Sequence, residues 1–254
     1  MNITEEDSGK KIKLYKSNRD DIISPEIPAN CGLLNCNQVI IICGQPGQGK
    51  SLLAENLVQN VFTYKKRSCF DKIFLFVPTT SASSYQNSYI QKIDPDNIYG
   101  DMSYENLREV LDKIYDLTHQ VKKKERGKET IYHTRHALII IDDFASKLRQ
   151  KDIQKLLLYI IQCHRHISTT LIIINQCYQS IHKDLRDCSN THIIFQTKSL
   201  KNRKAVYEEL LPNLTPDEFD ECMNYIYQDR HDFMIVNRKE DYFTRNFNKI
   251  NMSE

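Results

Sequence analysis

A glycine-rich loop placed directly after an apolar run constrains this chain more than any other feature. The apolar run is Val39–Cys43, and the loop that follows reads Gly44-Gln45-Pro46-Gly47-Gln48-Gly49-Lys50-Ser51. A buried strand that leads into such a loop, followed by a helix, lets backbone N–H groups and the positive helix end surround the β- and γ-phosphates of a nucleotide. We expect Lys50 to lie across those phosphates and the Ser51 hydroxyl to bind Mg²⁺. A glycine turn that only joins a strand to a helix needs neither side chain.

A second motif supplies two carboxylates. Four apolar residues, 138–141, end in Asp142 and Asp143. The run predicts a strand buried on both faces of a parallel sheet, and the carboxyl end of such a strand is where ligands bind in open α/β sheets. We expect Asp142 to hold Mg²⁺ and Asp143 to orient or deprotonate an attacking water. The alternative is an acidic pair that simply ends a core strand at the solvent boundary.

The rest of the chain alternates apolar runs with helical patterns. Strands are predicted at 39–43, 72–77, 137–141, 170–175 and 192–196, and helices at 50–62, 103–124, 150–163 and 201–211. This alternation predicts an α/β fold with a mostly parallel, doubly wound sheet. A capping box from Thr215 to Glu218 predicts one more helix, and residues 233–247 are typical of a C-terminal β-hairpin at the sheet edge.

Composition bounds the domain organisation and the partners. The 254 residues suffice for one large core, so we expect a polar N-terminal arm at 1–30 and a single domain at 31–254. The formal net charge is only +2, so contact with nucleic acid must come from a local basic patch. No apolar stretch approaches the ~18 residues that span a bilayer, and the N-terminus does not resemble a signal peptide, so we expect a soluble, unexported protein.

The chain has eight cysteines, scattered along its length. Because the motifs are typical of an intracellular enzyme, we expect reduced thiols. A zinc site made of Cys163, His164, His166 and Cys177 is conceivable, but packing or surface thiols are the simpler interpretation because Cys163 ends a predicted helix and Cys177 follows a predicted strand.

Two further polar residues bear on catalysis. Gln176 follows strand 170–175, so its amide is expected beside the acidic pair, where it could position the attacking water; plain solvent exposure is the alternative. Arg165 lies between the acidic strand and the Gln176 strand and could neutralise transition-state charge at a neighbouring subunit's nucleotide. A basic cap at the end of helix 150–163 explains Arg165 equally well.

Together these motifs resemble the HerA/FtsK superfamily, which has a RecA/FtsK-like P-loop core. The resemblance rests on the GQPGQGKS loop, the LIIIDD strand, the basic turn before the strand that ends at Gln176, Leu185-Arg186, and strand 191–195. The resemblance covers about residues 36–210. Within the superfamily, the chain most resembles the small single-domain viral branch in size and layout, which comprises the genome-packaging ATPases of poxviruses, giant viruses and virophages. The resemblance implies that Lys50 and Ser51 bind phosphate and metal, Asp142 holds Mg²⁺, Asp143 activates water and Gln176 senses the γ-phosphate. Arg165 resembles the trans-acting arginine, with Arg186 and Arg203 as reserves. Cellular members usually carry glutamate where this chain has Asp143.

The resemblance also implies partners and a location. Family members use ATP and Mg²⁺, assemble as rings that are usually hexamers, and pull double-stranded DNA through a central pore. The viral branch fills preformed capsids, which implies a capsid or portal vertex protein as partner and a location in the host cytoplasm (viral factory) or the virion. The basic run 122–128 is our candidate for DNA backbone contact, although most such runs are solvated loops.

Two other functions remain open at this stage. An AAA+ ATPase acting in DNA replication or remodelling shares the loop and the acidic strand, and Asn175 would serve as its polar sensor, but the chain shows no helical lid. A nucleotide kinase would need an acceptor pocket and an arginine-rich lid. The paired aspartates followed by Gln176 suit attack by water better than transfer to a bound acceptor.

Overall fold

The computed structural model describes residues 33–64, 67–81, 93–119, 122–125, 128–131 and 135–250. The expected arm at 1–30 lies outside the described residues, so the division of the chain near residue 30 stays a prediction. None of the described helices is long and apolar enough to cross a bilayer.

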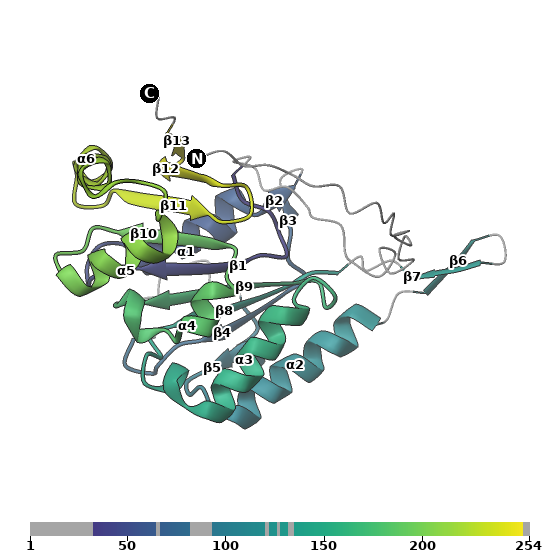
Figure 1. Cartoon of the computed structure of the whole chain (residues 1–254). Coiled ribbons are helices and arrows are strands. Elements are labelled where there is room, and N and C mark those ends of the chain that lie inside the picture. The colour runs from purple at the N-terminus through teal and green to yellow at the C-terminus, as the bar shows by residue number, and fades with distance from the viewer. Residues whose placement is uncertain are drawn as a thin grey trace, which may run out of the picture.

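A nine-stranded sheet forms the centre of the fold, in the order β13-β12-β11-β10-β1-β9-β8-β4-β5 (Figure 1). The strands from β10 to β5 are parallel to one another, whereas β11, β12 and β13 each pair antiparallel with the strand before them. The bounds are β1 Val39–Cys43, β4 Lys72–Phe76, β5 Ile98–Tyr99, β8 Ala137–Asp142, β9 Thr169–Asn175, β10 Thr191–Phe195, β11 Phe233–Asn237, β12 Tyr242–Arg245 and β13 Asn248–Lys249. Two separate hairpins pair β2 Thr63–Tyr64 with β3 Arg67–Ser68, and β6 Lys122–Glu125 with β7 Lys128–Ile131.

Helices cover both faces of this sheet. Their bounds are α1 Lys50–Asn56, continued by a π-helical turn at Leu57–Val61, α2 Tyr104–His119, α3 Lys151–Cys163, α4 Lys183–Asp187, α5 Leu200–Leu210 and α6 Pro216–Ile226. Short 3-10 turns lie at Pro95–Asn97, Lys147–Arg149 and Tyr178–Ser180. Alternate residues of β1 enter two cores: Ile41 packs in the cluster that includes residues from α2, α3, α5 and α6, whereas Ile40 and Ile42 pack with residues of α1. Burial on both faces explains why β1, β8 and β9 are continuous apolar runs.

The predicted fold class is confirmed, including the parallel core and the C-terminal hairpin. One helix prediction was wrong at its end. The helix expected at 103–124 stops at His119, and Lys122–Glu125 instead pairs with Lys128–Ile131 as a hairpin that extends beyond α2 (Figure 1). Lysine has a good helix propensity, so the local pattern favours continuation of the helix, and only pairing with a later segment overrides it.

Candidate active site

The glycine-rich loop has a backbone that its glycines make possible. Gly47 and Gly49 have φ angles of 75° and 96°, a region that residues with a Cβ atom rarely adopt. Gly44 is required for a different reason, because a Cβ atom there would lie 2.6 Å from the Cβ atom of Phe195 on β10. Gln48 folds back along the loop and donates to the Gln196 carbonyl at 2.8 Å. The loop is thus a tight curve between the end of β1 and the start of α1.

Lys50, Ser51 and Asp142 lie together, as the motifs predict. The Ser51 hydroxyl donates to the Asp142 carboxylate at 2.7 Å, and Lys50 Nζ donates to the Gln45 carbonyl at 3.1 Å. Burial lowers the pKa of Lys50, while the negative charges of Asp142 and Asp143 act in the opposite direction. A hydroxyl and a carboxylate are hard oxygen ligands suited to Mg²⁺, so this pair fits the expected metal.

Asp143 and Gln176 form a second pair at the same edge of the sheet. Gln176 Nε2 donates to Asp143 Oδ1 at 3.0 Å, and both residues are exposed. Asp143 has a φ angle of 60°, and its backbone N–H donates to the Ile174 carbonyl at 3.2 Å. Because its backbone turns sharply after β8, Asp143 leaves the sheet edge while Asp142 stays buried. The pair is accessible to a water molecule.

Asn175 would be the polar sensor if the chain were an AAA+ ATPase, but its side chain forms hydrogen bonds within its own turn. Its amide Nδ2 donates to Ser180 Oγ at 2.6 Å and to the Cys177 carbonyl at 3.3 Å. Its Oδ1 accepts from the Gln176 N–H at 3.0 Å. Asn175 therefore shapes the turn that presents Gln176.

The structure places Arg165 at the amino ends of the parallel strands, just before β9 begins. Arg165 is exposed in the turn between α3 and the start of β9, and it lines a cavity of about 410 Å³ with Asn37, His164 and Asn190. The phosphate-binding loop follows the other, carboxyl end of β1. Arg165 does not meet the nucleotide site of its own chain, and its role toward a neighbouring subunit stays a prediction.

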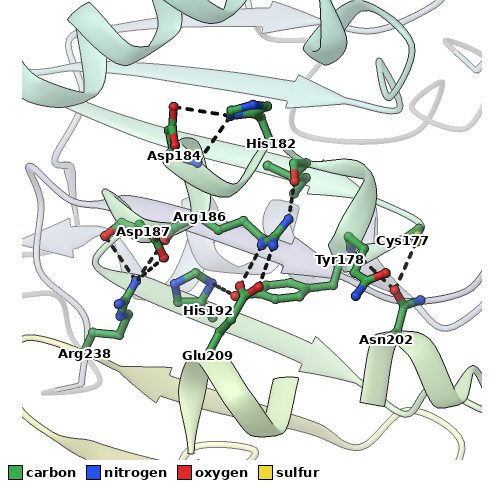
Figure 2. Close-up of polar contacts among 12 residues, drawn as sticks. Cys177, Tyr178, His182, Asp184, Arg186, Asp187, His192, Asn202, Glu209 and Arg238 are labelled. Atoms are coloured by element: carbon green, nitrogen blue, oxygen red, sulfur yellow. Dashed lines mark hydrogen bonds and ion pairs between the residues drawn. The ribbon is translucent and has the colours of Figure 1, made fainter. Parts of the chain in front are cut away.

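The two reserve arginines are both held in ion pairs. Figure 2 shows the Arg186 guanidinium facing the Glu209 carboxylate, with Nε and Nη2 at 2.8 and 2.6 Å from the two oxygens. The Arg186 side chain is only 8% exposed, lies 5.0 Å from the centre of the Tyr178 ring, and also donates to the Ile181 carbonyl. Arg203 pairs with Asp220 at 2.6 Å but is 35% exposed. Arg186 is thus part of the packing between α4 and α5.

Sequence reasoning missed two residues that contact the loop. His231 Nδ1 donates to the Gln48 carbonyl at 3.0 Å, and a Cβ atom on Gly47 would lie 3.0 Å from Arg230 Nη2. Both residues belong to the segment between α6 and β11. Because β11 is antiparallel to β10, with Phe233 opposite Phe195, this segment lies at the same edge as the phosphate-binding loop. The charged run before β11 was the only signal in the sequence.

The conceivable zinc site is not assembled within the part of the chain that the structure describes. No group of three or more His, Cys, Asp or Glu side chains there could hold a metal ion. The seven cysteines in that part, which exclude Cys31, are free thiols.

Comparison with known proteins identifies related sequences and folds. The family described as "Poxvirus A32 protein" matches residues 30–210. Among curated proteins, no sequence matches the chain.

Three solved structures show the fold. The DNA-packaging ATPase B204 from Sulfolobus turreted icosahedral virus is 12% identical with a TM-score of 0.58, covering 84% of this chain and 98% of its own. The genome-packaging NTPase B204 from Sulfolobus turreted icosahedral virus 2, bound to ATP-γ-S, is 14% identical with a TM-score of 0.55 and the same coverage, 84% and 98%. The pCW3 conjugation coupling protein TcpA, bound to ATP-γ-S, is 12% identical with a TM-score of 0.55, covering 85% of this chain and 63% of its own.

Proposed function

The chain belongs to the poxvirus A32 protein family, and we propose that it is an ATPase that drives double-stranded DNA into a viral capsid. The observation that carries this proposal is the pairing of Ser51 with Asp142 and of Gln176 with Asp143 at one sheet edge, beside Lys50. These are the parts that hydrolysis of a nucleoside triphosphate requires: a cation, a metal-binding pair and a base beside the phosphates. The similar viral structures are described as DNA- and genome-packaging enzymes, which supports DNA as the cargo.

In this proposal each side chain has a separate task. Lys50 moves from the Gln45 carbonyl to the phosphate oxygens and neutralises their charge. Asp143 accepts a proton from the attacking water, while the Gln176 amide, already bonded to Asp143 Oδ1, orients that water toward the γ-phosphate. Ser51 and Asp142 would hold Mg²⁺, which would supply further neutralisation of phosphate charge.

The proposal includes a ring of identical subunits. Arg165 lies at the amino ends of the parallel strands, and the phosphate-binding loop of the same chain lies at their carboxyl ends. A head-to-tail contact between two copies would therefore bring Arg165 of one copy toward the nucleotide site of the next. We propose that Arg165 acts in this way, in a ring that we expect to be a hexamer. A capsid or portal vertex protein completes the set of partners, and the site of action is the infected cell or the virion.

The experiment that tests this proposal combines an ATPase assay with a mass measurement of the assembly. We expect turnover by an oligomer, faster with long double-stranded DNA than without it. A protein that ignores DNA of several lengths but consumes ATP with a nucleoside or nucleotide acceptor would be a kinase, and the proposal would be wrong.

A further inference from the structure

The segment between α6 and β11 is tightly held against the C-terminal hairpin. Asp232, 6% exposed, accepts from the backbone N–H groups of Gln228 and Asp229 at 3.1 and 2.9 Å. It also accepts from Asn246 Nδ2 at 2.8 Å and Arg245 Nη2 at 3.2 Å. Although burial opposes ionisation, these hydrogen bonds, the Asn246 bond first, keep the Asp232 pKa below its ordinary value. The segment is therefore an ordered turn, held in place by the ionised Asp232 carboxylate.

This turn holds two side chains against the phosphate-binding loop. His231 Nδ1 donates to the Gln48 carbonyl at 3.0 Å, and it would lie 3.6 Å from a Cβ atom on Gly49. Arg230 Nη2 would lie 3.0 Å from a Cβ atom on Gly47. Gly47 and Gly49 have the positive φ angles that curve the loop. Both side chains thus adjoin the curved part of the loop, close to where its N–H groups would meet an anion.

Arg230 differs from other arginines of this region in its charge environment. Arg186, Arg203, Arg238 and Arg245 each pair with a carboxylate. Within the described residues, no carboxylate pairs with Arg230, and its side chain is exposed. An unneutralised guanidinium beside a loop of this kind suits a phosphate group, because its planar N–H groups match two phosphate oxygens.

We propose that Arg230 is a nucleotide-binding residue, supplied in cis, whose guanidinium binds phosphate oxygens of the nucleoside triphosphate. His231 is a positioning residue that ties the Arg230 turn to the Gln48 carbonyl. The inference rests on the proposed function, because it assumes that the loop binds a nucleoside triphosphate. It adds a contact from the C-terminal segment, which Asp232 holds against the C-terminal hairpin through Arg245 and Asn246.

Titration of the full-length protein with a fluorescent ATP analogue tests the binding role. Arg230→Ala should weaken binding about tenfold to hundredfold, the effect of losing charge-assisted hydrogen bonds, and Arg230→Lys should recover part of it. Arg108→Ala, which removes an exposed arginine on α2, is the matched control and should bind at the parent affinity. His231→Ala should also weaken binding, whereas His231→Asn, which keeps an N–H donor, should restore it.

A mixing experiment tests whether the contact is made in cis. Arg230→Ala chains lack the arginine beside an intact loop, and Lys50→Ala chains lack the loop lysine, so co-assembled mixtures should recover no ATP turnover. The Arg165→Ala and Lys50→Ala mixture is the opposite case, because a trans-acting Arg165 predicts recovery.

The outcomes separate the two proposals. Parent affinity in Arg230→Ala would overturn the role of Arg230, and recovery in the Arg230 mixture would overturn its action in cis. If the parent protein itself bound no nucleoside triphosphate, the proposed function would fail and this inference with it.

Discussion

Lys50 and Asp143 are close neighbours with separable tasks. Lys50→Ala removes the cation nearest the expected phosphates, so tight nucleotide binding should be lost. Asp143→Asn keeps an oxygen that can accept the Gln176 hydrogen bond but removes the base, so binding should persist while hydrolysis falls about 10²- to 10⁴-fold. Nucleotide titration and single-turnover hydrolysis measure the two effects. Hydrolysis at the parent rate by Asp143→Asn would refute the role of that carboxylate.

His192 predicts a pH dependence of stability. Burial, together with the positive charges of Arg238 and Arg186, lowers its pKa to about 3 from the ordinary value of 6.5. Between these two values the unfolded chain binds a proton that the folded chain does not, so stability falls as the pH drops below about 6.5. From pH 7.5 to 5.5 the free energy of unfolding should fall by about 1.4 kcal/mol more in the parent than in His192→Gln.

Urea unfolding at the two pH values measures this difference. His166→Gln, at an exposed histidine, is the control and should keep the pH dependence of the parent. An equal loss in the parent and in His192→Gln would show that His192 is not held neutral in the fold.

At the scale of elements, the Arg186–Glu209 pair joins α4 to α5 (Figure 2). Because both side chains are largely buried, Arg186→Met leaves the Glu209 carboxylate without its partner and should cost about 3–5 kcal/mol of unfolding free energy. Arg203→Met breaks a more exposed pair and should cost about 0–1 kcal/mol. Urea unfolding compares the two variants. Equal, small losses would contradict the structural role assigned to Arg186.

The β6–β7 hairpin carries the basic run that we expect to contact DNA. Neutralising Lys122, Lys123, Lys124, Arg126 and Lys128 together should reduce the DNA stimulation of ATP turnover and flatten its salt dependence. Basal turnover should hardly change, because the hairpin follows the C-terminal end of α2 and lies away from the carboxyl ends of β1 and β9, where the nucleotide is expected (Figure 1). Unchanged stimulation at every salt concentration would assign the run to a solvated surface. The contacts of these side chains lie outside the described residues.

The elements also show how far the sequence could predict this molecule. The loop, β1, β8 and β9 carry local signals, so the sequence could predict that Ser51, the two aspartates and Gln176 lie near one another at the carboxyl ends of the parallel strands. The hydrogen bonds from Ser51 to Asp142 and from Gln176 to Asp143 are findings of the structure. The end of α2 was not predictable, because helix propensity and hairpin pairing compete there. The contact of Arg230 and His231 with the loop could not be predicted, because only the antiparallel placement of β11 brings these residues there. In both cases the deciding interaction was pairing between strands, which the pattern of a single segment does not report.

At the scale of the whole molecule, the common direction of the parallel strands is the main feature. Lys50, Asp143 and Gln176 lie at the carboxyl ends of these strands, and Arg165 lies at their amino ends. A molecule with complementary opposite edges can repeat head to tail, and such contacts close into a ring when the rotation between copies permits. Ring size follows from the mass of the assembly, and we expect six subunits.

The central proposal is that this protein moves along double-stranded DNA. Displacement of the third strand from a DNA triplex measures that movement. With ATP, the assembled parent protein should strip the third strand from long duplexes of any sequence, and added salt should slow this by weakening backbone contacts. Asp143→Asn should bind the same DNA and nucleotide without displacing the strand. Stripping that needs no ATP, or an ATPase that DNA stimulates but that never strips the strand, would contradict the account of this protein as a DNA motor.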